Sequence, residues 1–218
     1  MNEYIDIFND KYEYLGTSTK KEAHAKGEWH RVFTCIIVDP QDETIVLQKK
    51  TPNRYNFERP DYLDISVGGH YKAGEAIEDG VREIKEELGI EVSYDKLVPL
   101  GIRQTVVTLA SNYINKEFQH IHLLEYKAPL DSYQLSGDEV SGVVKVPVSQ
   151  GIDLLTGKIN NIEAKGIFFL NNKEIEKKLN LSIEDFVPNY LKTDQIFLRL
   201  FIAAEKYFKK NYESNLFW

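Results

Sequence analysis

Three glutamates with helical spacing are the residues of this sequence best placed to do chemistry. Glu83, Glu86 and Glu87 stand at positions i, i+3 and i+4, which are neighbours on one face of an α-helix. Like charges this close raise the pKa of at least one carboxyl group unless a cation neutralises them. Carboxylate oxygens suit Mg²⁺ or Mn²⁺, and Mg²⁺ keeps positions open for water and phosphate oxygens. The spacing is therefore compatible with a divalent-metal site, although a solvated helix face is the more common meaning of such a pattern when it stands alone.

A helix over residues 75–88 is expected to position these carboxylates. Winding it at about 100° per residue gathers its apolar side chains into one narrow band, which predicts a core face. The band consists of Ile77, Val81, Ile84 and Leu88. Gly89 follows as a plausible C′ residue in the left-handed conformation. The glutamates fall in a separate sector, so the buried face determines where they point.

The residues around this helix resemble the Nudix box. That motif is Gly, five residues, Glu, seven residues, then Arg-Glu-apolar-any-Glu-Glu-any-Gly-apolar. The residues that match it here are Gly69, Glu75, Arg82, Glu83, Glu86, Glu87, Gly89 and Ile90. The spacing departs from the motif once, because six residues rather than seven separate Glu75 from Arg82. The missing residue falls where the loop becomes helix, so it affects the expected placement of Glu75 more than that of the helical glutamates.

The resemblance implies a fold and a reaction. The fold is an α/β (α+β) Nudix-type α/β/α sandwich with a mixed sheet, in which the box forms a loop, a helix and a second loop. The reaction is hydrolysis of a pyrophosphate bond, in which metal ions held by the glutamates bridge the phosphates and a metal-activated water attacks phosphorus. The implied cofactor is Mg²⁺ or Mn²⁺.

The resemblance also implies roles for individual residues. Glu86 and Glu87 are metal ligands, and Glu83 is a further ligand or the general base. Arg82 orients a neighbouring glutamate, and the carbonyl group of Gly68 is an additional ligand.

Some Nudix proteins take their base from beyond the box. Glu117 and Glu139 are the candidates for that role here, with an ordinary surface carboxylate as the alternative for each.

A wider resemblance, over roughly residues 1 to 150, is to the Nudix proteins related to isopentenyl-diphosphate isomerase. The segments that carry it are residues 22–31, 47–50 and 66–70. Isomerisation in that subgroup requires a cysteine before a Gly-His pair, and this sequence has Gly68 there. The one cysteine, Cys35, falls in a predicted strand, where a small buried hydrophobe is its usual role. Hydrolysis is therefore favoured, with isomerisation and ligand sensing without turnover as alternatives.

Three histidines resemble a separate metal site of those isomerases. His24, His30 and His70 match its imidazole ligands, although six residues of offset replace the expected seven between the first two. Glu117 matches one of its glutamates, whereas Gln119 stands where the second would fall. The resemblance implies a second metal site. The alternative is that these histidines are polar residues beside the active-site cleft, because imidazole sites need matching geometry from every ligand.

The predicted partner is a small molecule of the nucleoside-diphosphate type or another organic diphosphate. Cations that face a cleft offset phosphate charge. The predicted phosphate contacts are Lys49, Lys50, Arg54, Arg59 and Arg103. Glu139 is a further predicted substrate contact. These residue types leave the organic part of the substrate open.

Composition argues against several other classes of protein. The 218 residues include 27 Lys+Arg and 34 Asp+Glu, and the formal charge of −7 disfavours nucleic acid and anionic membranes as partners. No apolar run approaches the roughly 20 residues needed to span a bilayer, and the first ten residues lack the pattern of a secretory signal. A single cysteine excludes an internal disulfide and fits a reducing compartment, so we expect a cytoplasmic protein.

One domain with two extensions is predicted. Its core covers about residues 30–156, an N-terminal strand and helix extension covers 1–29, and a C-terminal helical extension covers 157–218. Strands are predicted at 31–39, 44–48, 62–67, 98–109, 117–126 and 142–146. A mixed segment at 159–188 precedes a long helix at 194–210. The apolar side of that helix predicts docking onto the body of the protein or, equally, a homodimer contact through residues 194–218.

Overall fold

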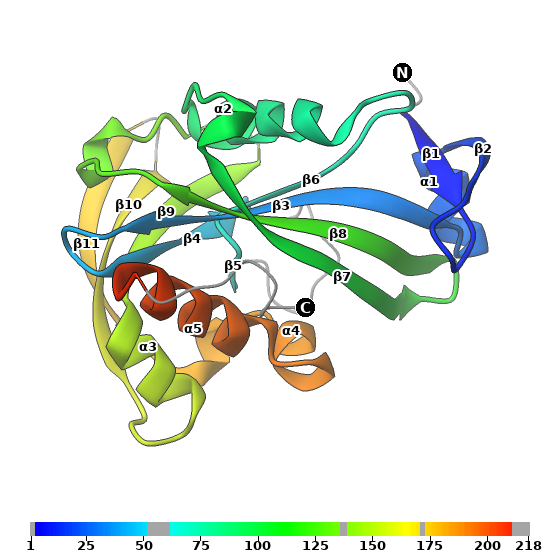
Figure 1. The fold of residues 1–218 in the computed structure, drawn as a ribbon. Helices are drawn as coiled ribbons and strands as arrows, with labels where there is room; N and C mark the ends of the chain where they lie inside the picture. Colours follow the sequence, from blue (N-terminus) through cyan, green and yellow to red (C-terminus); the bar gives the residue numbers. More distant parts are fainter. Residues whose placement is uncertain (1–2, 52–61, 136–138, 171–172, 211–218) are drawn as a thin grey trace.

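A mixed β-sheet with α-helices on both faces forms the centre of the computed structural model, which describes residues 3–51, 62–135, 139–170 and 173–210 (Figure 1). The strands are β1 (Tyr4–Phe8), β2 (Tyr14–Thr19), β3 (Trp29–Asp39), β4 (Thr44–Lys50), β5 (Leu63–Asp64), β6 (Val67–His70), β7 (Leu97–Ala110), β8 (Tyr113–Glu125), β9 (Val140–Pro147), β10 (Ile162–Leu170) and β11 (Lys173–Leu181). The α-helices are α1 (Lys20–Lys26), α2 (Arg82–Leu88), α3 (Val148–Leu155), α4 (Pro188–Thr193) and α5 (Ile196–Phe208). Short 3₁₀ helices are η1 (Ile77–Val81), η2 (Tyr94–Lys96), η3 (Leu130–Ser132) and η4 (Ile183–Asp185).

Strand β3 is the strand around which the sheet is organised. It pairs antiparallel with β1, β4 and β6 and parallel with β8, which makes the sheet mixed. The parallel register sets His30 opposite Glu117, and the antiparallel register sets Val32 opposite His70. Residues distant in sequence therefore meet along the first half of β3. The predicted hairpin of β3 and β4 forms, with Ile37 opposite Val46.

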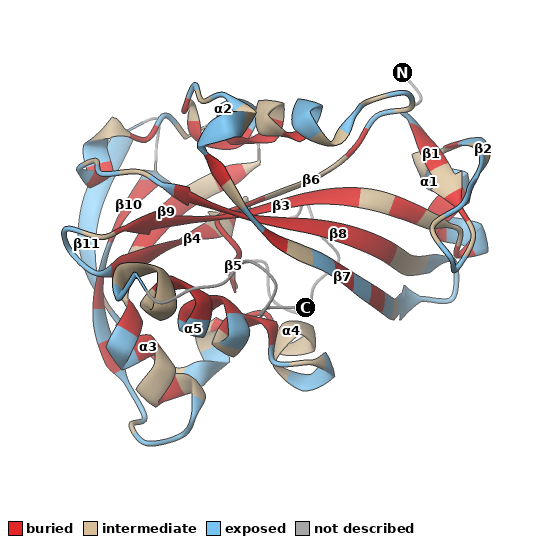
Figure 2. Ribbon diagram, in the orientation of Figure 1, coloured by how far each residue is buried: buried red, intermediate tan, exposed pale blue. Residues whose placement is uncertain are grey.

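The two faces of β3 carry different cores because successive side chains of a strand point to opposite sides. Phe33, Cys35 and Ile37 belong to the cluster that includes Ile84 and Leu88 of α2. Their neighbours Ile36 and Val38 belong to the cluster that includes apolar residues of α3 and α5. Figure 2 shows both helical layers turning buried residues toward the sheet. The sheet thus fixes α2 on one face and the C-terminal helices on the other.

The glutamate-bearing segment differs from the expected continuous helix. Its first part, η1, is a 3₁₀ helix, and the α-helical part begins at Arg82. Five 3₁₀ residues advance about 10 Å, and six α-helical residues advance about 9 Å. The tighter winding thus spans a comparable distance with one residue fewer, which accounts for the short spacing. Gly89 ends α2 in the left-handed conformation, at φ 70°, as predicted.

The terminal segments contain more strand than predicted. The N-terminal stretch forms the antiparallel pair β1 and β2, and Thr19 then caps α1 by accepting a hydrogen bond from the Glu22 backbone N–H. In the C-terminal segment, predicted as a helical extension, β10 and β11 extend the sheet beyond β9 before α4 and α5 begin. The outward residues of β11 are charged and give no apolar alternation, which is why the sequence did not indicate a strand.

Helix α5 docks within the chain. Its buried residues are Ile196, Phe197, Leu200, Phe201, Ala203 and Ala204, and it packs against α3. This accounts for much of the apolar stripe without a second copy of the protein, although residues 211–218 of the proposed dimer contact lie outside the described residues. Within the described parts of the chain, none of the helices combines the length and apolar character needed to cross a membrane.

The docking of α5 predicts unequal effects for two neighbouring substitutions. Phe201 is fully buried and its ring lies where a Cβ atom on Gly151 of α3 would stand, whereas Ile202 is 36% exposed. Phe201→Ala should lower the free energy of unfolding by about 3–5 kcal/mol, because it removes buried surface and leaves a cavity. Ile202→Ala should lower it by about 1 kcal/mol or less. Urea denaturation measures both, and equal losses would contradict the docked arrangement.

Candidate active site

A cavity of about 520 Å³ brings several of the sequence-predicted residues together. Its described lining includes Glu83, Glu86, Arg82, Gly68, His70, Glu117 and Glu139. Glu3 and Lys20 enter it from the N-terminal segment and Tyr190 from α4, so both terminal segments help to build its wall. Its volume is typical of a pocket for a small molecule.

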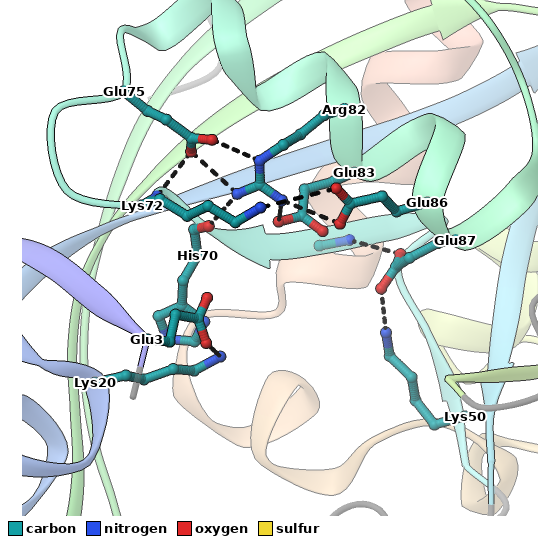
Figure 3. A network of polar contacts seen from close by, with 11 residues as sticks. Glu3, Lys20, Lys50, His70, Lys72, Glu75, Arg82, Glu83, Glu86 and Glu87 are labelled. Carbon is teal, nitrogen blue, oxygen red and sulfur yellow. Dashed lines mark hydrogen bonds and ion pairs between the residues drawn. The ribbon is translucent and has the colours of Figure 1, made fainter. Parts of the chain in front are cut away.

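Arg82 is the centre of the carboxylate cluster. Its Nε donates to Glu75 Oε1 at 2.6 Å and its second terminal nitrogen to Glu75 Oε2 at 3.0 Å. The other terminal nitrogen donates to Glu83 Oε1 at 2.6 Å and to Glu86 Oε2 at 3.2 Å (Figure 3). The nitrogen that contacts Glu75 Oε2 also donates to the carbonyl oxygen of His70 at 2.8 Å. The shortened box therefore still brings Glu75 to Arg82, and Arg82 touches two of the helical glutamates.

Glu83 is the carboxyl group of this cluster whose titration is most altered. It is 7% exposed, and burial raises its pKa to about 7, with the charges of Glu87 and Glu86 adding to the rise and Arg82 opposing it. Its carboxyl lies directly over Gly69, where an added Cβ atom would stand 2.1 Å from the carboxyl carbon. Only glycine at this position of β6 lets the side chain of Glu83 approach the strand. The carboxyl group of Glu83 therefore gains or loses its proton near neutral pH.

Glu87 lies deeper than its two neighbours. It is 1% exposed and is absent from the described lining of the cavity, although Lys50 and Gln48, which hold it, both line that cavity. Lys50 Nζ donates at 2.8 Å, and Gln48 Nε2 and the Gly68 backbone N–H each donate at 3.2 Å. Burial raises the pKa of Glu87, and Lys50 lowers it. A cation bound by Glu83 and Glu86 could also bind Glu87 only if the three groups that donate to Glu87 moved.

The three predicted histidines converge beside the carboxylates. Candidate ligand atoms of His24, His30 and His70 lie within 4.8 Å of one another. Burial lowers the pKa of His24 and of His30 to about 4, and it lowers the pKa of His70 well below its ordinary value. The Nε2 atoms of all three are buried and have no hydrogen-bond partner among the described residues. Neutral imidazoles with unpaired nitrogens are the form that binds a metal ion.

Glu117 lies beside the three histidines. Its Oε1 lies 4.0 Å from Nε2 of His30, and its pKa is raised by burial. His120 and His122, on the opposite face of β8, contact the hydroxyl groups of Tyr12 and Tyr94 at 2.6 and 3.2 Å, which fits their expected structural role.

Two predicted phosphate contacts are placed differently from the expectation. Lys49 is not among the described residues lining the cavity, and its ammonium group lies 5.8 Å from the ring centroid of Phe168. Its neighbour Lys50, also among the predicted contacts, faces the cavity, because the side chains of β4 alternate. Arg103 is 3% exposed and is held by an ion pair with Asp194. Outside the described residues lie the other two predicted contacts, Arg54 and Arg59.

Sequence reasoning missed four charged residues that line the cavity, namely Glu3, Lys20, Asp64 and Lys72. Lys20 stands four residues before His24 on α1, a helical spacing that could have associated it with the histidines. Asp64 lies on β5, and burial raises the pKa of its carboxyl group. A single carboxylate inside the apolar run before Gly68 was the signal for it.

Cys35 points away from this site. It is fully buried in the cluster beneath α2, on the face of β3 opposite to Thr34, which lines the cavity. Burial also raises the pKa of its thiol. Cys35 therefore does not lie beside His70 in the cleft, where its thiol would have supported the isomerase alternative.

Comparisons with known proteins identify the family of this chain. The profile of the NUDIX domain matches residues 28–165. The chain is 38% identical over 201 residues to an uncharacterized Nudix hydrolase of Clostridium acetobutylicum, covering 90% of this chain and 96% of that protein. It is 28% identical over 147 residues to the isopentenyl-diphosphate Delta-isomerase of Aliivibrio fischeri, covering 66% of this chain and 79% of that one.

A solved structure supports the fold. The crystal structure of DR0079 from Deinococcus radiodurans matches with a TM-score of 0.53 at 21% identity, covering 71% of this chain and 90% of that one. The predicted α/β fold with a mixed sheet and terminal extensions is confirmed. With the profile matched over most of its length, this chain belongs to the Nudix hydrolase family.

Proposed function

We propose that this protein hydrolyses the pyrophosphate bond of a small organic diphosphate, of the nucleoside-diphosphate type or similar, with Mg²⁺ or Mn²⁺ as cofactor. The observation that carries the proposal is the pair Glu83 and Glu86, joined through Arg82 at the wall of the cavity. Nudix enzymes act on small molecules that contain a diphosphate, and the cavity has room for an organic group beside it.

The donor set fits a hard divalent cation. Glu83, Glu86 and the nearby Glu87 offer carboxylate oxygens, and burial, with the charges of Glu87 and Glu86 adding to it, raises the pKa of Glu83. Gly68 lines the cavity beside them, and its carbonyl group is proposed as a further ligand. When bound, the cation supplies positive charge to the phosphate oxygens and makes a coordinated water more acidic.

The protein's own groups provide the remaining functions. Glu83, whose carboxyl group lies at the wall of the cavity beside Glu86, is proposed to accept a proton from the attacking water. Glu117 and Glu139 line the same cavity and are the alternatives for this role. Lys20 and Lys72 also line it, so their ammonium groups are proposed to contact phosphate oxygens.

The histidines are proposed as a second metal site, distinct from the glutamates in chemistry. Imidazole nitrogens suit transition metals such as Zn²⁺ or Co²⁺ better than Mg²⁺. The support for this site is the convergence of His24, His30 and His70 with unpaired Nε2 atoms. Isomerisation is the less favoured activity because Gly68 replaces the required cysteine and Cys35 lies on the other face of β3.

Glu86→Gln should abolish metal-dependent release of products from any diphosphate that the protein cleaves. The amide keeps the size of the side chain but removes a charge from the proposed metal site, so a fall in kcat on the order of 100-fold or more is expected. Product release from a panel of nucleoside and sugar diphosphates with Mg²⁺ or Mn²⁺ measures it. Glu91→Gln is the matched control, since Glu91 is exposed beyond the helix and pairs with Lys85.

Thermal melting verifies that both variants fold. Glu86→Gln turning over as fast as the parent protein would remove Glu86 from the reaction. An intact substrate panel in the presence of demonstrably bound metal would favour a ligand sensor instead.

Glu83→Gln should change how stability depends on pH in chelator-treated protein. Because the folded pKa of about 7 lies above the ordinary 4.5, the ionised carboxyl disfavours folding, and stability is lost as pH rises through 7. The variant lacks this titration. Its free energy of unfolding relative to the parent protein should therefore increase by roughly 2–3 kcal/mol between about pH 5 and pH 8.

Urea denaturation at several pH values measures the free energy of unfolding of the variant and of the parent protein. Subtracting one from the other removes, to first order, the contributions of the other titrating groups. Glu78→Gln, on the exposed side of η1, is the control and should run parallel to the parent protein. If Glu83→Gln also runs parallel, the carboxyl group is not held near neutral pH.

A further inference from the structure

A chain of polar contacts connects the C-terminal segment to the histidine group. It begins at Asp194, between α4 and α5, whose two carboxylate oxygens each accept a hydrogen bond from Arg103 of β7 at 2.8 Å. The remaining terminal nitrogen of Arg103 donates to Gln119 Oε1 at 2.7 Å. All three nitrogens of this buried guanidinium group thus donate to protein oxygens, and the ring centroid of Tyr190 lies 5.5 Å away.

Gln119 passes this contact to Glu117. Its Nε2 donates to Glu117 Oε2 at 2.6 Å, and both side chains lie on one face of β8, two residues apart. The orientation of the amide follows from chemistry, because a guanidinium group only donates and an ionised carboxylate only accepts. An amide bridges these two groups without adding charge. A glutamate at position 119 would accept from Arg103 but would repel Glu117.

The last link faces the imidazoles. The contact with Gln119 engages Oε2 of Glu117, while Oε1 lies 4.0 Å from the unpaired Nε2 of His30. Glu117 is 6% exposed, so a carboxylate there is costly unless it is paired or bound to a cation. Oε1 of Glu117 and one nitrogen from each of the three imidazoles offer four ligand atoms. Their chemical type suits a divalent transition metal.

We propose that the C-terminal extension holds Glu117 in its orientation toward the histidine metal site, through Asp194, Arg103 and Gln119. This inference rests on the second metal site proposed above and extends it. Arg103 is then a positioning residue and not a phosphate contact. Partners behind metal ligands commonly set their orientation, and losing one weakens metal affinity by roughly 10- to 100-fold.

The test is the affinity of the full-length, chelator-treated protein for Co²⁺, whose visible absorption reports imidazole ligation. His24→Ala identifies the part of the signal that belongs to the histidine site. Asp194→Asn and Gln119→Met should each weaken that affinity by roughly 10- to 100-fold and alter the spectrum. Mg²⁺ affinity at the glutamates should stay within about threefold of the parent protein, on the scale of ordinary surface changes.

Tyr207→Phe is the matched control. The hydroxyl group of Tyr207 on α5 donates to Glu125 Oε2 at 2.8 Å, so it also ties the C-terminal extension to β8, but at the far end of that strand. This variant should leave Co²⁺ affinity and spectrum unchanged. If Asp194→Asn does not fold, Gln119→Met decides, because it preserves the ion pair between Arg103 and Asp194.

Two results would overturn the proposal. Unchanged Co²⁺ affinity in a folded Gln119→Met protein would make the chain of contacts purely structural. A parent protein without any His24-dependent Co²⁺ signal would remove the histidine site altogether. Neither result bears on hydrolysis at the glutamates, which Glu86→Gln tests separately.

Discussion

The guanidinium group of Arg82 connects the parts of the chain on which the carboxylate site depends. It joins Glu75 of the loop, the carbonyl group at the end of β6, and Glu83 and Glu86 of α2. A planar fork of donors can meet several oxygens in fixed directions, which an ammonium group cannot do. Lys72 adds a second cation, with its Nζ 4.0 Å from Glu86 Oε1. The burial of Glu83 beside other carboxylates is the physical argument for the divalent cation proposed at this site.

Candidate metal donors of two different kinds adjoin one another, and His70 is the one of the three histidines that lines the cavity. Oxygen donors come from α2, whereas imidazole donors come from α1, β3 and β6. His70 takes part in both groups, because Arg82 holds its carbonyl oxygen while its ring faces His24 and His30. The parallel pairing of β3 with β8 then brings Glu117 opposite His30. A hard cation such as Mg²⁺ would therefore bind the carboxylates, and a softer transition metal would bind the imidazoles. Ligand type, and not distance, would separate the two cations.

The parts of this arrangement that follow from local pattern could be predicted from sequence, and the parts that depend on distant pairing could not. Helix α2, its core face and the Gly89 cap all follow from a period of 3.6 residues. The 3₁₀ form of η1 does not, because spacing alone does not reveal how the chain absorbs a missing residue. The phase of β4 was equally hidden, so the sequence did not distinguish Lys49 from Lys50, which lines the cavity. Arg103 was read as a phosphate contact because its partner Asp194 lies 91 residues away.

Hydrolysis is tested most directly by running the metal-activated protein with a panel of organic diphosphates in ¹⁸O-labelled water and weighing the products by mass spectrometry. Attack of water on phosphorus predicts one ¹⁸O atom in one phosphate-bearing product of each cleaved substrate, and none when Glu86 is replaced by Gln. A diphosphate that rearranges at constant mass without gaining ¹⁸O would contradict hydrolysis and indicate isomerisation instead.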